Sequence, residues 1–239
     1  IDHKDVERKI TRYTKEIMPV HMSGRVCNLA ALMKIARKHK LAIVEDACQA
    51  VGGSYRGKRL GSLGDVGAFS FNHFKIISCG EGGAMMTSNL NAYDRGLIFH
   101  DGGAVFRAYA DRLKTPFFAG MNFRVSEFQG AILFEQLKRL DPILARLRAR
   151  QAAMTKVLAR SSALTISPSN ELKGDCGVVV ALIFDTEKEA KAFTDRVNKK
   201  KLGIGAGRPI DSGRHVYTNW EPIMKKHGSH TAKLNPFNW

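Results

Sequence analysis

The stretch NLAALMKIARKHKLAIVEDA, residues 28–47, decides the fold class of this 239-residue chain. In its first part, apolar side chains recur every three or four residues, which predicts an amphipathic helix. Its second part, LAIVEDA, is an apolar run of strand length that ends in two carboxylates, and the run EIMPVHM at residues 16–22 precedes the helix. A strand, a helix and a strand at this spacing predict a βαβ unit and a parallel sheet.

The same pattern continues towards the middle of the chain. VGAFSFN at residues 66–72 and GAMMTS at residues 83–88 are short apolar runs next to glycine-rich turns, and both are typical of strands. We therefore expect an α/β fold with a mostly parallel sheet and helices on both faces. Sheets of this kind bind ligands at the carboxyl ends of their strands.

The second half of the chain predicts a further domain. Residues 125–161 have a helical pattern with a break at Asp141-Pro142, and a predicted strand at 175–184 and a predicted helix at 186–201 follow. We expect residues 1–144 to form part of a large domain and residues 145–239 part of a smaller C-terminal α/β domain. Because the chain opens without methionine and stops without a closing helix, we also expect it to be truncated at both ends.

Composition limits the partners and the location. No apolar run approaches the roughly 20 residues that cross a bilayer, and the first residues are too charged for a signal peptide, so we predict a cytoplasmic protein with no membrane partner. The formal charge of +16 leaves nucleic-acid binding open as an alternative, but the basic residues are scattered and no recognition motif accompanies them. The four cysteines lack the spacing of a zinc site, so we expect no metal.

Four residues stand where chemistry is expected. Asp46 ends a predicted strand, which would place its carboxylate at the ligand edge of the sheet, although a cap for the following turn is an equal alternative. Gln49 lies three residues later, and Lys75 follows the next strand. A lysine in a partly desolvated site becomes a nucleophile for carbonyl groups. An aspartate opposite it suits a cofactor with a protonated pyridine nitrogen, and the Ser70 hydroxyl could hold a phosphate.

Several motifs occur together and in order. They are PVHMSG, EDACQA, FSFNHFK, GEGG and GMNFRVSEFQGAILFEQLKRLD, which span residues 19–141. From about residue 10 to residue 141 the chain resembles the DegT/DnrJ/EryC1/StrS family of sugar aminotransferases, which depend on pyridoxal 5′-phosphate (PLP). The resemblance implies the fold type I of PLP enzymes. It also implies transfer of an amino group from glutamate or glutamine to a keto-sugar, a nucleotide keto-sugar or a ketocyclitol.

The resemblance assigns roles to five positions. Lys75 matches the catalytic lysine that forms the Schiff base with PLP and then moves a proton during the reaction. Asp46 matches the aspartate that pairs with the ring nitrogen, and Gln49 matches a glutamine near the phenolic oxygen of the ring. Ser70 matches a phosphate ligand, and Asn122 matches an asparagine that the partner subunit offers to the phosphate. The resemblance therefore implies a homodimer with shared active sites.

Substrate contacts are predicted at three further residues. His21, in PVHMSG, either lines the site or is a hydrogen-bonded histidine of the core. His215 and Tyr217 lie in RHVYTNW, which resembles the substrate-side segment of the family.

The resemblance is incomplete. The Ser/Thr-rich phosphate-binding turn and the ring-stacking aromatic residue of the family have no counterpart in this chain. Since a helix N-terminus is a strong anion site, its loss should weaken cofactor retention. An alternative is therefore a cofactor-poor fragment, or a non-catalytic regulatory or scaffold relative that retains the fold. A sugar dehydratase is another interpretation, but the dehydratases of the family carry histidine where this chain has Lys75.

Overall fold

The computed structural model describes residues 1–211 and 215–228, and the chain forms two compact units. Unit 1 contains residues 1–161 and 166–181, and unit 2 contains residues 162–165 and 182–239. The predicted boundary after residue 144 falls inside a helix of unit 1 that runs over Leu140–Leu158. The compact units therefore do not follow that boundary, and the division into large and small domains stays a prediction.

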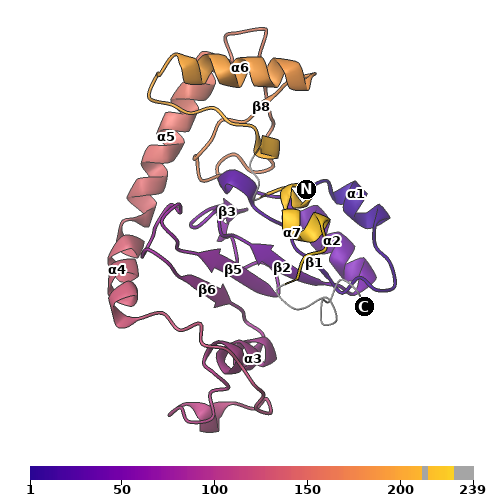
Figure 1. The fold of residues 1–239 in the computed structure, drawn as a ribbon, viewed down its shortest axis with the longest axis vertical. Coiled ribbons are helices and arrows are strands. Elements are labelled where there is room, and N and C mark those ends of the chain that lie inside the picture. The colour runs from indigo at the N-terminus through magenta and orange to yellow at the C-terminus, as the bar shows by residue number, and fades with distance from the viewer. Residues whose placement is uncertain (212–214, 229–239) are drawn as a thin grey trace. The chain divides into compact units, whose positions relative to one another are not determined.

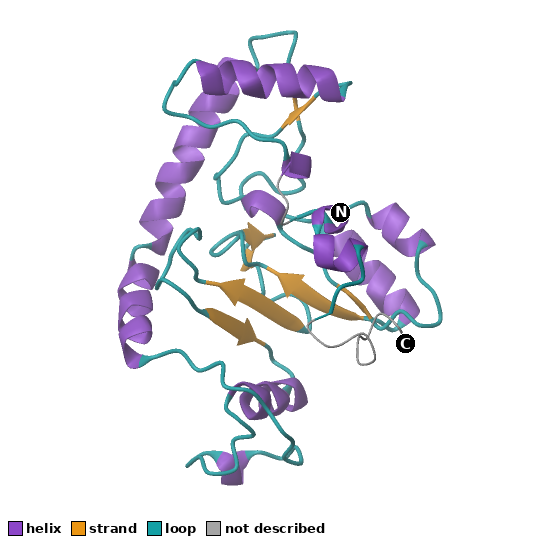
Figure 2. Ribbon diagram, in the orientation of Figure 1, coloured by secondary structure: helices purple, strands orange, loops and turns teal. Residues whose placement is uncertain are grey.

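The centre of unit 1 is a four-stranded sheet (Figures 1 and 2). Its order is β1 (Glu16–Ile17), β2 (Ala42–Asp46), β5 (Val66–Ser70) and β6 (Gly83–Met86). The first three strands are parallel, and β6 is antiparallel to β5. The predicted α/β class with a mostly parallel sheet is thus confirmed.

Helix α2 (Leu29–His39) connects β1 to β2, as the opening stretch predicts. The Asn28 side chain caps its first turn by accepting a hydrogen bond from the Ala31 N–H at 3.2 Å. Lys40 ends the helix in the left-handed conformation, with φ of 55°. The buried residues Leu29, Leu32, Ile35 and Ala36 share one face of the helix, and most of them pack against Ile17 and Ile43 of the sheet. Burial of this apolar face holds the βαβ unit together.

Unit 1 also contains helices α1 (His3–Arg8), α3 (Leu90–His100), α4 (Glu127–Lys138) and α5 (Leu140–Leu158), two 3₁₀ helices (Met22–Gly24 and Ala110–Arg112), and the hairpin of β3 (Ser54–Tyr55) with β4 (Lys58–Arg59). The predicted break in the long helical segment lies at Arg139, between α4 and α5. Pro142 sits in the first turn of α5, where the amide hydrogen that proline lacks would have no partner within the helix.

Unit 2 contains α6 (Glu187–Lys199), α7 (Glu221–Met224) and two 3₁₀ helices (Pro209–Asp211 and Tyr217–Asn219). Helix α6 begins at the predicted place because Thr186 and Glu189 form a capping box.

The predicted strand at 175–184 was largely wrong. Only Leu182–Ile183 (β8) is a strand, paired with Thr165–Ile166 (β7) where the chain passes between the units. The earlier part of the run is held elsewhere, since the Cys176 N–H donates to the Gly24 carbonyl at 2.8 Å and Gly177 has φ of 79°.

Candidate active site

Asp46 lies at the end of β2, beside the end of β5. It is in register with Ala68, so Ser70, two residues further along β5, presents its side chain on the same face of the sheet. The Asp46 side chain is half-buried, and its Oδ1 accepts a hydrogen bond from the Cys48 N–H at 3.0 Å. One oxygen thus caps the following turn, as the alternative interpretation expected. Within the described residues the Asp46 carboxylate has no ion-pair partner, and its hydrogen bonds come from Cys48 alone.

Lys75 lies in the turn that follows β5 and is also half-buried. Asn72 shapes this turn: its carbonyl accepts the Lys75 N–H at 3.0 Å, and its side chain accepts the Phe74 N–H at 3.1 Å. The buried side chains of Ile77 and Cys79 then anchor the segment in the core. The lysine is therefore carried by a short turn that is fixed on both sides.

Asp46 and Lys75 both influence the pKa of the Cys48 thiol. Burial and, next, the hydrogen bond to Asp46 raise the pKa of Cys48 to about 11, whereas the positive charge of Lys75 acts in the opposite direction. Both charged groups therefore lie within electrostatic reach of the same side chain. Within the described part of the chain, neither Asp46 nor Lys75 forms an ion pair with any residue, including each other.

Gln49 reaches a different turn. Its side-chain oxygen accepts the Ser23 N–H at 2.8 Å, and Ser23 has φ of 55°. This bond ties the Gln49 side chain to the 3₁₀ turn at Met22–Gly24, and the predicted contact of Gln49 with the ring oxygen stays a prediction.

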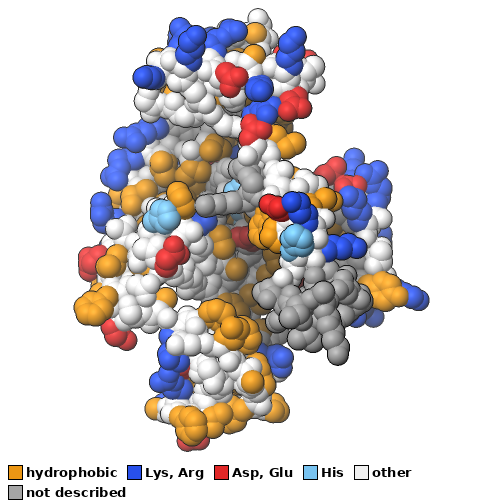
Figure 3. Space-filling model, viewed as in Figure 1, with side chains coloured by type: hydrophobic (Ala, Val, Ile, Leu, Met, Phe, Trp, Pro, Cys, Tyr) orange, Lys and Arg blue, Asp and Glu red, His pale blue; other side chains and the backbone are white. Residues whose placement is uncertain are grey.

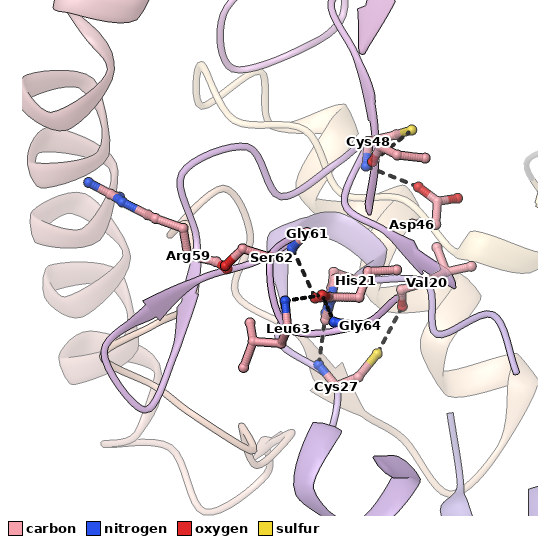
Figure 4. A network of polar contacts seen from close by, with 12 residues as sticks. Val20, His21, Cys27, Asp46, Cys48, Arg59, Gly61, Ser62, Leu63 and Gly64 are labelled. Atoms are coloured by element: carbon pink, nitrogen blue, oxygen red, sulfur yellow. Dashed lines mark hydrogen bonds and ion pairs between the residues drawn. The ribbon is translucent and has the colours of Figure 1, made fainter. Parts of the chain in front are cut away.

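His21 lies in the interior of unit 1, with 0% of its surface exposed, where the sequence left open a place beside the substrate or in the core. Its Nδ1 accepts the Cys27 N–H at 3.1 Å, and its Nε2 faces the Glu45 carboxylate at 3.3 Å (Figure 4). Since a backbone N–H points at Nδ1, the imidazole proton lies on Nε2 and is donated to Glu45. Both ring nitrogens are engaged inside the protein, which corresponds to the hydrogen-bonded core histidine of the sequence analysis.

Glu45 is a functional candidate that sequence reasoning missed. It is fully buried, and besides His21 its two oxygens accept the backbone N–H groups of Gly61, Leu63 and Gly64 at 2.6–2.9 Å (Figure 4). Burial works against the charged form, but these hydrogen bonds lower the pKa of Glu45 below its ordinary value. A signal was available, because alternation along β2 places the neighbouring Glu45 and Asp46 on opposite faces.

Asn122 lies in an exposed segment, where it bridges to Asp101 across an isolated antiparallel contact. Its side-chain oxygen accepts the Arg124 N–H at 3.2 Å, and the buried Asp101 carboxylate pairs with Arg124 at 2.6 Å. No described hydrogen bond links Asn122 to Asp46, Ser70 or Lys75. The structure thus brings Asp46, Ser70 and Lys75 to the carboxyl ends of the central strands β2 and β5. It holds Asn122 in a separate loop of unit 1.

His215 and Tyr217 belong to unit 2, and both side chains are exposed. Tyr217 begins a 3₁₀ turn, Tyr217–Asn219. Their predicted substrate contacts stay predictions.

Two further properties concern the described residues as a group. They contain no cluster of three or more His, Cys, Asp or Glu side chains that could hold a metal ion. None of the helices in residues 1–211 and 215–228 is both long and apolar enough to span a membrane.

Known proteins are similar to this chain in both sequence and fold. The chain is 41% identical over 146 residues to GDP-perosamine synthase of Caulobacter vibrioides, an alignment that covers 61% of this chain and 38% of that protein. It is 31% identical over 236 residues to the L-glutamine:2-deoxy-scyllo-inosose aminotransferase of Micromonospora echinospora, with 93% and 53% covered. The crystal structure of 3-amino-5-hydroxybenzoic acid synthase matches with a TM-score of 0.77 and 30% identity, over 92% of this chain and 58% of that one.

The extent of these matches is also informative. The chain spans about half the length of the relatives it matches. The profile of one family, in contrast, covers nearly all of the chain, from residue 1 to residue 209. This protein therefore belongs to the DegT/DnrJ/EryC1/StrS aminotransferase family.

Proposed function

We propose that this protein is a PLP-dependent aminotransferase that moves an amino group from glutamate or glutamine to a keto-sugar, a nucleotide keto-sugar or a ketocyclitol. One observation carries the proposal: Asp46 ends β2 and Lys75 lies in the turn after the neighbouring parallel strand β5, and both are half-buried without ion-pair partners among the described residues. The names of the relatives support the reaction class, since one makes GDP-perosamine and another aminates 2-deoxy-scyllo-inosose.

The residues at this edge fit PLP group by group. A half-buried carboxylate without a cationic partner is costly, and a protonated pyridine nitrogen would supply that partner to Asp46. The unpaired Lys75 amine matches the carbonyl group of the cofactor. The Ser70 side chain, on the same face as Asp46, is placed to donate to the phosphate.

Each side chain would then have a distinct task. When bound, PLP supplies an electron sink for the bond broken at the substrate carbon. Lys75 would hold the cofactor through its Nζ and carry the proton at the reacting carbon. Asp46 would keep the ring nitrogen protonated, and Gln49 would orient the ring. Retention of lysine at position 75 favours amino transfer over dehydration.

The proposal includes a homodimer with shared sites. Apolar side chains of unit 1 are exposed on α3, on the loop that follows it and on α4, and Phe106 and Phe128 have 99% and 84% of their surface exposed. Figure 3 shows hydrophobic side chains gathered over α3 and the segment after it. A second copy packed on this surface would bury them and would receive Asn122 near its phosphate group.

The substrate contacts and the location complete the proposal. His215 and Tyr217 would contact the acceptor substrate. We also propose a cytoplasmic location, which fits four cysteines that form no disulfide.

Cofactor binding tests the proposal directly. The protein incubated with PLP should turn yellow, and borohydride should abolish the visible absorbance by reducing the bond to lysine. Lys75→Ala should remove the colour and the amino transfer from glutamate or glutamine to a panel of keto-sugars and ketocyclitols. Lys58→Ala, at an exposed position on β4, is the matched control and should keep both. A wild-type protein that stays colourless would contradict the proposal and point to a regulatory or scaffold relative.

A further inference from the structure

The strongest unassigned feature is the buried pair of His21 and Glu45. Both side chains have 0% of their surface exposed, and every nitrogen and oxygen of the two has a hydrogen-bond partner. Apolar side chains of similar volume are often as stabilising as a buried charge with its hydrogen-bond partners, or more so. Stability alone therefore does not account for a fully satisfied carboxylate at this place.

Backbone bonds connect the pair to Asp46. The His21 N–H donates to the Asp46 carbonyl at 3.0 Å, and the Asp46 N–H donates to the Pro19 carbonyl at 3.0 Å. Segment 19–21 therefore lies along the last residue of β2, extending the parallel pairing through the bridge between Val20 and Asp46. His21 thus contacts residue 45 through its ring and residue 46 through its backbone.

Glu45 and Asp46 have different surroundings on the two faces of β2. Glu45 is in register with Gly67, and Asp46 with Ala68, so the two carboxylates point to opposite faces of the sheet. On one face, Glu45 is held by the turn at residues 61–64 and by His21. On the other face, the Asp46 carboxylate has only the hydrogen bond from Cys48 among the described residues. The pair on the first face therefore reaches the Asp46 carboxylate only through the backbone of segment 19–21 and of β2.

We propose that His21 and Glu45 are positioning residues for Asp46, and that their buried pair fixes the end of β2 so that the Asp46 carboxylate stays directed at the cofactor nitrogen. This inference rests on the proposed function for its consequence in catalysis. The positional effect itself does not depend on the cofactor, because all of its contacts lie within unit 1.

Two variants separate the positioning role from simple packing. His21→Leu keeps roughly the volume but removes the hydrogen bonds to Cys27 and Glu45. His21→Gln can keep both, since its amide oxygen accepts and its amide nitrogen donates. Leu32→Ala is the control: it opens a cavity at a fully buried residue of α2 but removes none of the hydrogen bonds of the pair.

The first measurement uses the cofactor-free protein. The Cys48 amide donates to the Asp46 carboxylate, and the adjacent Ala47 amide donates to Ala68 of β5 at 3.0 Å. In His21→Leu, hydrogen exchange of Cys48 relative to Ala47 should accelerate by roughly tenfold, because the carboxylate no longer holds one position. The ratio should stay near the wild-type value in His21→Gln and Leu32→Ala. An unchanged ratio in folded His21→Leu would overturn the proposal.

The second measurement uses the PLP-loaded protein. A displaced Asp46 should shift the pH at which the visible absorbance changes and should lower kcat by roughly 10- to 100-fold in His21→Leu. A merely structural residue would lower thermal stability without moving the pH profile, as Leu32→Ala should do. If the wild type shows no Lys75-dependent colour, the proposed function fails, and the Cys48 exchange ratio then decides the positioning role by itself.

Discussion

At the residue scale, Asp101 shows how one buried carboxylate organises a loop. It follows α3, and its oxygens accept hydrogen bonds from Arg107, Tyr109 and Arg124. The hydrogen bonds from Arg107 and Tyr109, followed by that from Arg124, outweigh burial and hold the pKa of Asp101 well below its ordinary range. The same residue bridges to Asn122, so its charge stabilises the loop that carries the proposed phosphate ligand.

This shift predicts loss of stability in acid. A carboxyl whose pKa is lowered by folding stabilises the protein at pH values above the unfolded pKa, which is about 4 for aspartate. That contribution disappears as the pH falls below 4 towards the folded pKa. Glu45, whose pKa is also lowered, acts in the same direction. Denaturant unfolding should therefore show a free energy of unfolding that decreases from pH 5 downwards.

Asp101→Asn identifies the residue responsible. The variant should be less stable than wild type at pH 7, and its stability should fall less steeply between pH 5 and pH 3. Asp195→Asn is the control, because Asp195 is exposed on α6. Asp65→Asn would be unsuitable, because the Asp65 carboxylate accepts the Ile43 N–H. Parallel pH profiles for wild type and Asp101→Asn would show that Asp101 is not protonated in this range.

At the element scale, the close approach of β5 to the turn at residues 61–64 requires glycine. A Cβ at Gly67 would lie 2.0 Å from the Gly61 carbonyl oxygen, and a Cβ at Gly61 would lie 2.3 Å from the Phe69 ring. The turn can approach the strand this closely only without those side chains. Glu45 accepts hydrogen bonds from the same turn. The contact between this turn and β5 therefore helps to position the end of β2, where the proposed active site lies.

Gly67→Ala should destabilise unit 1. The added methyl meets backbone that cannot move aside without breaking the Glu45 hydrogen bonds, and overpacking of this kind costs about 1–3 kcal/mol. Thermal unfolding of the PLP-free protein measures the effect.

Gly130→Ala is the matched control, and its effect on stability should have the opposite sign. Gly130 lies inside α4, and apart from its chain neighbours and the adjacent backbone of its own helix, no described atom lies within 4 Å of the Cβ position. Alanine there should raise the stability by roughly 0.5–1 kcal/mol. Equal effects of the two substitutions would contradict the steric argument for Gly67.

At the scale of the whole molecule, the exposed apolar surface of unit 1 predicts self-association. Phe128→Asp places a charge on α4, at a side chain that is 84% exposed. If a second copy covers this helix, the variant should sediment as a monomer under conditions where the wild type is a dimer, and it should lose PLP affinity because Asn122 no longer reaches a partner. Burying an unpaired charge in an interface costs several kcal/mol.

Val157→Asp is the control for this experiment. Val157 is an exposed apolar residue in the last turn of α5 and lies outside the proposed surface. The control should sediment like wild type. A wild-type protein that is monomeric at all concentrations would contradict the homodimer.

The sequence by itself determined the α/β class and the boundaries of α2 and α6 to within two residues, and it predicts the chemistry of Lys75 and Asp46. These depend on local rules: apolar periodicity, capping by Asn28 and Thr186, and the placing of polar residues after apolar runs. The strand predicted at 175–184 failed because that segment bonds to a turn more than 140 residues away in the chain.

Only the tertiary structure decided what surrounds each of the two adjacent carboxylates. Alternation along a strand separates Glu45 from Asp46, but it does not say which face is covered. The turn at residues 61–64 and His21 cover the Glu45 face, and this leaves the Asp46 carboxylate at the edge near Lys75. The same contacts buried His21, which sequence reasoning had placed either at the substrate or in the core. Long-range packing made that choice, because burial depends on what folds over a residue.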